Sequence, residues 1–256
     1  MQAEITILGS GTSMGVPTLG CSCEVCTSTD PRDCRTRPSI AVRWNDFCVV
    51  IDTGPDFRAQ ALREGVKHVD AVLYTHAHAD HILGLDDLRP LSFQRKEKIP
   101  LYADDGAALT IERIFDYTFD PNSPYATRAR VQMHRLPDSV AIGGAVFHRV
   151  PLMHGELEVA GFRFGSAAYL TDVSAIPERS VPLLQGLDVL IIDALRRRPH
   201  PSHATLDQSL EFVRMLAPRR AFFTHLSHDL HHAATESALP DHVRLAYDGL
   251  RIPFEI

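Results

Sequence analysis

Residues 76–81 read His76-Ala77-His78-Ala79-Asp80-His81, which places four side chains of metal-binding type within six residues. Imidazole and carboxylate groups are ligands for Zn²⁺, Mn²⁺ and Fe²⁺. In a loop, this spacing lets alternate side chains turn toward two adjacent ions rather than one. The run directly follows the apolar stretch Leu73-Tyr74-Thr75. We therefore expect it just past the carboxyl end of a buried strand, where open α/β sheets place their sites.

The apolar stretches at residues 169–171 and 222–224 end in the same way. The side chains that follow them, and a third one shortly after the apolar residues 150–151, are Asp172, His225 and His154. A single histidine in such a position is usually a surface or core residue whose hydrogen bonds are satisfied. Together with residues 76–81, however, these side chains predict one metal centre that is assembled from several strand ends.

Short β-branched runs alternate with helical patterns along the chain. The expected strands are Ile5–Leu8, Ile40–Trp44, Cys48–Asp52, Ala71–Thr75, Ile99–Tyr102, Ala145–Val150, Ala167–Thr171, Val189–Ile192, Ala221–Thr224 and Val243–Tyr247. The expected helices are Phe57–Arg63, Leu85–Leu91, Ala107–Tyr117, Pro177–Leu184 and Leu206–Leu216. This mixture predicts an α/β fold of layered, mixed sheets. Because we find no repeat or flexible linker, we expect one domain over residues 1–256.

The composition is that of an ordinary globular protein, with 256 residues of which 45% are hydrophobic and 23% charged. The 26 Lys and Arg against 32 Asp and Glu give a net charge of −6. This charge disfavours a nucleic-acid partner, because backbone phosphates require clustered cations. No apolar stretch is long enough to span a bilayer, and the first residues lack the pattern of a secretory signal. We therefore expect a cytoplasmic protein that makes no membrane contact.

In residues 76–81 and the strand-end residues Asp172, His225 and His154, the sequence resembles the metallo-β-lactamase superfamily. The signature H-x-H-x-D-H of that superfamily is complete at residues 76–81. The resemblance implies a four-layer αββα sandwich, in which helices flank two mixed sheets, and two divalent metal ions, Zn or Mn, at the active site. It implies three groups of ligands: His76, His78 and His154 for one metal, Asp80, His81 and His225 for the other, and Asp172 as the bridge. Asp52, which follows the apolar residues 49–51, matches the family's early Asp that supports the metal ligands. A turn-capping role before Gly54 is compatible with this.

All five cysteines lie in the first fifth of the chain, and such an odd, crowded set in a cytosolic protein indicates metal rather than disulfides. The segment Gly20-Cys21-Ser22-Cys23-Glu24-Val25-Cys26 supplies three thiolates, one fewer than a tetrahedral ion requires. Three small buried thiols are the alternative interpretation. Cys34 and Cys48 are expected to be loop and core residues.

The amino end, Thr6-Ile7-Leu8-Gly9-Ser10-Gly11-Thr12-Ser13-Met14-Gly15-Val16-Pro17, resembles the opening of the tRNase Z and PhnP-like branches, in which a strand runs into a glycine-rich loop. In the PhnP family, phosphodiesterases that open cyclic phosphates, such cysteines hold a structural zinc together with a late histidine. The resemblance implies one structural Zn in a loop at about residues 20–35. Its ligands would be Cys21, Cys23, Cys26 and His228.

The segment Pro199-His200-Pro201-Ser202-His203-Ala204-Thr205 resembles the loop that carries a histidine near the scissile phosphate in PhnP-like enzymes. We align His203 with this histidine and expect it to be the general acid, with His200 as the rival. The adjacent Arg196, Arg197 and Arg198 either help to hold an anion or form a solvated basic run. We expect His231 and His232 to lie on an exposed polar face.

The resemblance implies a phosphodiesterase for a small phosphodiester or cyclic phosphate, which uses a hydroxide activated by the two metals. The expected catalytic residues are His203, Asp172 and Asp80. Alternatives are a tRNA 3′-processing endonuclease, an ester, thioester or lactone hydrolase, and a non-catalytic PqqB-like metal-binding protein. The expected partner is a small phosphate ester. The oligomeric state, a homodimer included, and the role of the loop Thr118–Arg130 are left open.

Overall fold

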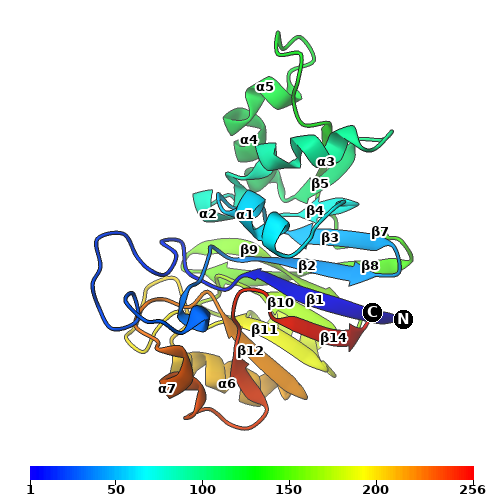
Figure 1. The fold of residues 1–256 in the computed structure, drawn as a ribbon. Coiled ribbons are helices and arrows are strands. Elements are labelled where there is room, and N and C mark those ends of the chain that lie inside the picture. Colours follow the sequence, from blue (N-terminus) through cyan, green and yellow to red (C-terminus); the bar gives the residue numbers. More distant parts are fainter.

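The computed structural model describes residues 1–256 and contains two β-sheets of seven strands each (Figure 1). The first sheet has the order β14 (Arg251–Glu255), β1 (Gln2–Gly9), β2 (Ser39–Trp44), β3 (Phe47–Ile51), β4 (Ala71–Leu73), β5 (Ile99–Ala103) and β6 (Val131–Arg135). The second sheet has the order β13 (Val243–Leu245), β12 (Arg220–Thr224), β11 (Val189–Asp193), β10 (Ala167–Leu170), β9 (Leu157–Phe164), β8 (Ala145–His154) and β7 (Ser139–Ile142).

Short helices connect the strands. The α-helices are α1 (Phe57–Arg63), α2 (Ala79–Ile82), α3 (Arg89–Phe93), α4 (Asp105–Ile114), α5 (Asp116–Phe119), α6 (Leu206–Leu216) and α7 (His232–Glu236). The 3₁₀ helices are η1 (Pro31–Asp33), η2 (Leu85–Leu88) and η3 (Glu178–Leu184).

Three apolar cores define the layers. One core lies between the two sheets and contains Trp44 from the first sheet and Phe162 from the second. Another covers the outer face of the first sheet, where Phe57 of α1 and Ile111 of α4 pack on it. The last core covers the outer face of the second sheet and includes Val213 of α6. The order is helix, sheet, sheet, helix, which confirms the predicted αββα sandwich (Figure 1).

The structure departs from the expected elements in a few places. Strands β6, β7, β9 and β14 were not expected; Gly161 weakens the pattern of β9 and Pro253 that of β14, an edge strand on which a missing N–H is tolerated. The segment expected as a helix over Pro177–Leu184 is the 3₁₀ helix η3, which contains Pro182 and therefore lacks one backbone donor. Helices α1 and α6 have the expected bounds.

The parallel strands determine where the chemically active side chains meet. β3 and β4 are parallel neighbours in the first sheet, and β10, β11 and β12 are parallel neighbours in the second. Parallel strands end at a common edge, so each sheet presents one row of carboxyl ends. The residues at or just after these ends are Asp52, His76, Asp172, Asp193 and His225.

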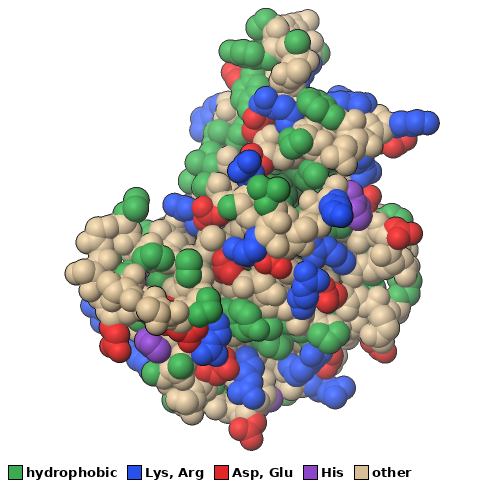
Figure 2. Space-filling view, viewed as in Figure 1, with side chains coloured by type: hydrophobic (Ala, Val, Ile, Leu, Met, Phe, Trp, Pro, Cys, Tyr) green, Lys and Arg blue, Asp and Glu red, His purple; other side chains and the backbone are tan.

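The two ends of the chain lie side by side, because β1 and β14 pair antiparallel with Gln2 opposite Glu255 (Figure 1). On the face drawn in Figure 2, Lys and Arg side chains are intermixed with Asp and Glu side chains. None of the helices combines the length and the apolar composition that crossing a membrane requires.

Candidate active site

One group of predicted ligands gathers where β4, β8 and β10 end. It consists of His76, His78, His154 and Asp172, whose candidate ligand atoms lie within 4.8 Å of one another. Nε2 of His76 lies 2.9 Å from Nδ1 of His78 and 4.0 Å from Oδ1 of Asp172. The structure thus brings together the residues expected around the first metal.

The second group lies beside the first and shares a carboxylate with it. The ligand atoms of Asp80, His81 and His225 lie within 4.8 Å of one another. Nε2 of His81 is 3.2 Å from Oδ2 of Asp80 and 3.2 Å from Oδ2 of Asp172. Nε2 of His225 is 3.4 Å from Oδ1 of Asp172. Asp172 therefore lies between the two groups, where a bridging ligand belongs.

Asp52 orients two of the imidazoles from behind. Its Oδ2 accepts from Nδ1 of His81 at 2.7 Å and from the hydroxyl of Thr75 at 2.9 Å. Because the Thr75 hydroxyl donates its hydrogen bond to Asp52, its oxygen accepts one from Nδ1 of His76, which lies 2.9 Å away. Both rings therefore carry their proton on Nδ1 and turn a bare Nε2 toward the cluster. Asp52 thus lies where the family resemblance implies a residue that supports the metal ligands.

The donor set fits a pair of metal ions. Nδ1 of His154 donates to the carbonyl of Ser202 at 2.7 Å, which leaves its Nε2 free as a ligand. Nε2 of His81 and both ring nitrogens of His225 are buried without any hydrogen-bond partner. Buried polar atoms normally have partners. Unpaired imidazole nitrogens that face carboxylates are what a site for divalent cations requires.

The electrostatics of the cluster also favour cations. Burial lowers the pKa of His76 well below its ordinary value and that of His154 to about 4. Burial opposes ionisation of Asp172, but the surrounding imidazoles, His225 foremost, lower its pKa well below the usual range. Burial likewise opposes the charge on His225, yet the neighbouring carboxylates, Asp172 foremost, raise its pKa to about 9. The carboxylates thus stabilise positive charge inside the cluster.

Three of these residues have a left-handed backbone. The φ angles are 64° at Asp52, 54° at Asp172 and 58° at His225, each directly or shortly after a strand. Such angles cost about 1–3 kcal/mol for a residue other than glycine and concentrate at functional sites. The sharp turn holds each side chain at the end of its strand.

Close backbone packing positions the loop that carries the H-x-H-x-D-H signature. A Cβ on Gly54 would lie 2.0 Å from the carbonyl oxygen of Asp80, and one on Gly84 would lie 2.1 Å from the carbonyl oxygen of Gly54. Both are closer than a side chain can approach, so only glycine allows these segments to touch. The contact fixes Asp80 relative to the loop after β3.

His203 lies against the cluster and is held by a buried carboxylate. Its Nδ1 is 2.7 Å from Oδ2 of Asp193, which is fully buried at the end of β11. Its Nε2 lies 3.9 Å from Oδ1 of Asp172, and its ring stacks on that of His225 with centroids 4.6 Å apart. Sequence reasoning missed Asp193, although it follows an apolar strand just as the predicted ligands do.

His200, the other candidate for the general acid, lies beside His203 and makes different contacts. Its ring centroid is 5.0 Å from that of His203, and its Nδ1 faces the backbone N–H and hydroxyl of Ser202, each at 3.3 Å. No carboxylate lies within 4.0 Å of its ring, in contrast to His203. His203 is therefore the histidine that is oriented toward the cluster.

The cysteines gather around one imidazole. Nδ1 of His228 lies 3.2 Å from Sγ of Cys21, 3.5 Å from Sγ of Cys23 and 3.4 Å from Sγ of Cys26. The backbone N–H of Cys26 lowers the pKa of Cys23 to about 7, which favours the thiolate. The four residues thus form a group of the size and chemistry of a tetrahedral Cys₃His zinc site. Cys34 is exposed and Cys48 buried, in line with their expected places.

The expectation of an exposed polar face at residues 231 and 232 is wrong for His232, which is fully buried. Its backbone N–H donates to Oδ1 of Asp33 at 2.8 Å, and its Nε2 lies 3.3 Å from Oε2 of Glu236. His231 is half-buried and caps the start of α7. The polar sequence around residue 232 therefore gave no sign that His232 packs α7 against the amino-terminal loop.

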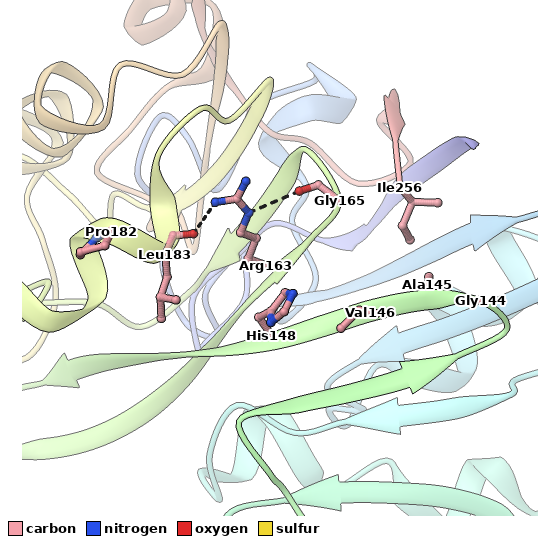
Figure 3. A pocket seen from close by; sticks show the side chains of 9 residues that line it. All are labelled: Gly144, Ala145, Val146, His148, Arg163, Gly165, Pro182, Leu183 and Ile256. Carbon is pink, nitrogen blue, oxygen red and sulfur yellow. Dashed lines mark hydrogen bonds between the residues drawn. The ribbon is translucent and has the colours of Figure 1, made fainter.

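Two cavities are lined in part by residues of the predicted site. One of about 710 Å³ is lined by His76 and Arg149, among others. The other, of about 190 Å³, is lined by His203 and Arg196. A third cavity, of about 490 Å³, has no predicted ligand in its lining, and its Arg163 already donates to the carbonyls of Leu183 and Gly165 (Figure 3). The predicted site residues therefore line the first two cavities and not the third.

Comparison with known proteins identifies the class. The β-lactamase superfamily domain matches residues 48–226. A crystal structure described as a new diphosphatase from the PhnP family has 52% sequence identity and a TM-score of 0.94, and the match covers 99% of this chain and 98% of that one. The chain therefore belongs to the β-lactamase superfamily and, within it, to the PhnP family.

Two other relatives differ in what their names describe. An octanoyltransferase of Porphyromonas gingivalis is 38% identical over 250 residues, which are 95% of this chain but only 50% of that protein. The chain thus spans about half the length of this relative. Zn²⁺-bound PqqB from Methylobacterium extorquens is 20% identical with a TM-score of 0.79, over 97% of this chain and 99% of that one. At that identity the likeness shows the fold alone.

Proposed function

We propose that this protein is a metal-dependent hydrolase that cleaves a phosphorus–oxygen bond in a small phosphodiester, cyclic phosphate or diphosphate. The observation that carries the proposal is the pair of His203 and Asp193 beside the predicted metal ligands. A histidine oriented by a buried carboxylate is the arrangement that moves protons during hydrolysis. Membership in the PhnP family, one member of which is described as a diphosphatase, supports phosphorus as the atom attacked.

The ligand chemistry supports two Zn²⁺ or Mn²⁺ ions at the cluster and one structural Zn²⁺ at the cysteines. Two such ions, when bound, lower the pKa of a water molecule toward neutrality and hold the oxygens of the phosphate. Asp52 keeps the bare nitrogens of His76 and His81 turned toward them. Asp172 and Asp80 supply the negative charge that offsets the ions.

His203 acts as the general acid. Nδ1 of His203 is hydrogen-bonded to Asp193, so Nε2 is the nitrogen that delivers the proton. This nitrogen is the one near Asp172, so a phosphate bound at the cluster would present its leaving oxygen to it. The proton passes from Nε2 to that oxygen as its bond to phosphorus breaks. The Asp193 carboxylate stabilises the imidazolium before the transfer.

The size and charge of the surroundings support a small substrate. The larger cavity, of about 710 Å³, lies within the range of about 300–1,000 Å³ typical of small-molecule sites, and the smaller one, of about 190 Å³, lies below it. The net charge of −6 disfavours binding along a nucleic-acid backbone. The longer relative is named an octanoyltransferase, and thioester hydrolysis is one of the alternatives raised from the sequence, so an octanoyl thioester is included in the test.

The acid role can be tested by varying the leaving group. His203→Ala should reduce kcat about 10²- to 10⁴-fold for a ribose cyclic phosphate, whose alkoxide needs a proton. The loss should be far smaller for bis(p-nitrophenyl) phosphate, because p-nitrophenolate leaves without one. His200→Ala is the matched control and should have little effect on either substrate. Equal losses on both substrates would contradict the acid role, and faster cleavage of an octanoyl thioester than of any phosphate would overturn the substrate class.

A further inference from the structure

We propose that Arg196 forms a subsite for the phosphate of the departing half of a diphosphate substrate. This rests on the proposed function and adds the chemical class of the leaving group, which is an anionic phosphate rather than an alcohol. The subsite would make Arg196 a specificity-determining residue, next to the acid but separate from the metal ligands.

The subsite is the cavity of about 190 Å³ that His203 lines. Thr12 and Ser13, from the glycine-rich loop after β1, line it together with Arg196 from the loop after β11. A general acid must face the oxygen that leaves. The cavity that opens beside His203 is therefore the place for the departing group.

Arg196 is the cation in this cavity that no carboxylate neutralises. It is half-buried, its Nε donates to the carbonyl of Arg198 at 3.1 Å, and its Nη2 donates to the carbonyl of Pro199 at 3.0 Å. Two of its five N–H groups are thus used, which leaves three for a ligand. No ion pair within 4.0 Å involves its guanidinium.

The neighbouring arginine is different. Nη2 of Arg198 lies 3.1 Å from Oδ2 of Asp229, and the side chain of Arg198 is 76% exposed. Arg198 is therefore already paired and largely solvated. Two carbonyls hold the Arg196 guanidinium in place, so it is preorganised for a phosphate, which guanidinium groups bind with paired hydrogen bonds.

The chemical step balances without any further reagent. The oxygen of water forms a bond to one phosphorus, and the bond from that phosphorus to the bridging oxygen breaks with its electron pair going to the oxygen. Nε2 of His203 gives that oxygen its proton, while one proton of the water passes to solvent and the other stays on the product. Arg196 stabilises the charge on the departing phosphate. An alcohol leaving group would gain nothing from it.

The test compares two substrates in the metal-loaded protein. Diadenosine diphosphate releases a phosphate monoester, whereas bis(p-nitrophenyl) phosphate releases a phenolate without a phosphate. Arg196→Ala should lower kcat/KM for diadenosine diphosphate by about 10- to 100-fold and change that for bis(p-nitrophenyl) phosphate by less than about twofold. Arg196→Lys keeps the positive charge but not the paired N–H donors of the guanidinium, so it should recover part of the loss. Arg197→Ala is the control, because Arg197 is exposed and does not line the cavity.

The outcomes separate the two proposals. Equal losses on both substrates would overturn the subsite while the hydrolase stands. Cleavage of bis(p-nitrophenyl) phosphate without cleavage of diadenosine diphosphate by the unmodified protein would also overturn it. If the metal-loaded protein cleaves no phosphate substrate, the proposed function itself fails. Bound metal and the melting temperature of Arg196→Ala show whether that variant is folded, and Arg196→Lys repeats the comparison if it is not.

Discussion

The two groups of predicted metal ligands are built in different ways. The histidine and aspartate cluster lies at the ends of strands from both sheets, and nearly all of its side chains are buried. The cysteine group lies in a loop without regular structure, and His228, after β12, ties it to the second sheet. Cys23 is exposed, while Cys21 and Cys26 are half-buried.

This difference supports different roles for the two proposed metal sites. In the cluster, Asp52 and Thr75 fix the imidazoles before any metal binds, and two cavities leave access for a substrate. The cysteine group offers four ligands for one ion, so a metal there would be fully coordinated. We infer that the sheets preorganise a reactive centre, whereas the cysteine group joins a long loop to the fold.

The largest effect is expected from removing the bridging carboxylate. Asp172→Ala should abolish hydrolysis, lowering kcat/KM by roughly 10³-fold or more, because both metals lose a ligand. Metal analysis should find about two fewer ions per chain, while the cysteine site keeps its ion. The exposed Asp241 provides the control Asp241→Ala. Full activity in Asp172→Ala would refute the assignment of this residue.

A smaller effect is expected from changing Asp52, which contacts metal ligands but is not predicted to bind metal itself. Asp52→Asn replaces one carboxylate oxygen by an amide nitrogen, which cannot accept both the Nδ1 proton of His81 and the hydroxyl proton of Thr75. Loss of such a supporting partner weakens metal binding roughly 10- to 100-fold. A titration with Zn²⁺ in a competing chelator measures this. Unchanged affinity would mean that the strand ends alone orient the ligands.

The cysteine group should affect stability far more than activity. His228→Ala should remove one ion per chain and lower the melting temperature by roughly 4–8 °C, for a loss of about 2 kcal/mol. Activity of the folded protein toward bis(p-nitrophenyl) phosphate should stay within about threefold, since no ligand of the cluster changes. His242→Ala, on the exposed surface, is the control. A loss of activity as complete as that of Asp172→Ala would show that the two sites are not separate.

The smallest perturbation is chemical labelling of thiols. In the metal-loaded protein, a thiol-reactive disulfide reagent should modify only Cys34. Bound metal protects the three thiols of the cysteine group, and Cys48 is buried. Burial raises the pKa of Cys48 to about 11, which keeps it as an unreactive thiol. Chelation should raise the number of modified cysteines from one to four. Three or more reactive thiols before chelation would argue against the cysteine site.

Much of the fold and the site could be predicted because strand ends leave a clear pattern. An apolar run followed by His or Asp marks Asp52, His76, Asp172 and His225. Asp193 has the same pattern, but only its contact with Nδ1 of His203 in the folded chain shows that it belongs to the site. The missed strands β9 and β14 contain Gly161 and Pro253, which weaken any local pattern.

Tertiary contacts explain the rest. The burial of His232 depends on Asp33, almost 200 residues away in the chain, so its polar neighbours are misleading. The Gly54 contact with Asp80 likewise depends on packing between two loops. Which of the arginines at 196–198 lacks an ion pair likewise depends on Asp229, which lies 31 residues away in the chain and pairs with Arg198.

The most direct test of the whole account is a metal count made together with an activity assay. We predict about three ions per chain after reconstitution. Mild chelation should remove two of them and all phosphodiesterase activity without unfolding the protein, and the third should leave only as the cysteines become reactive. A single tightly bound zinc, with phosphodiesterase activity unchanged by chelation, would contradict the account.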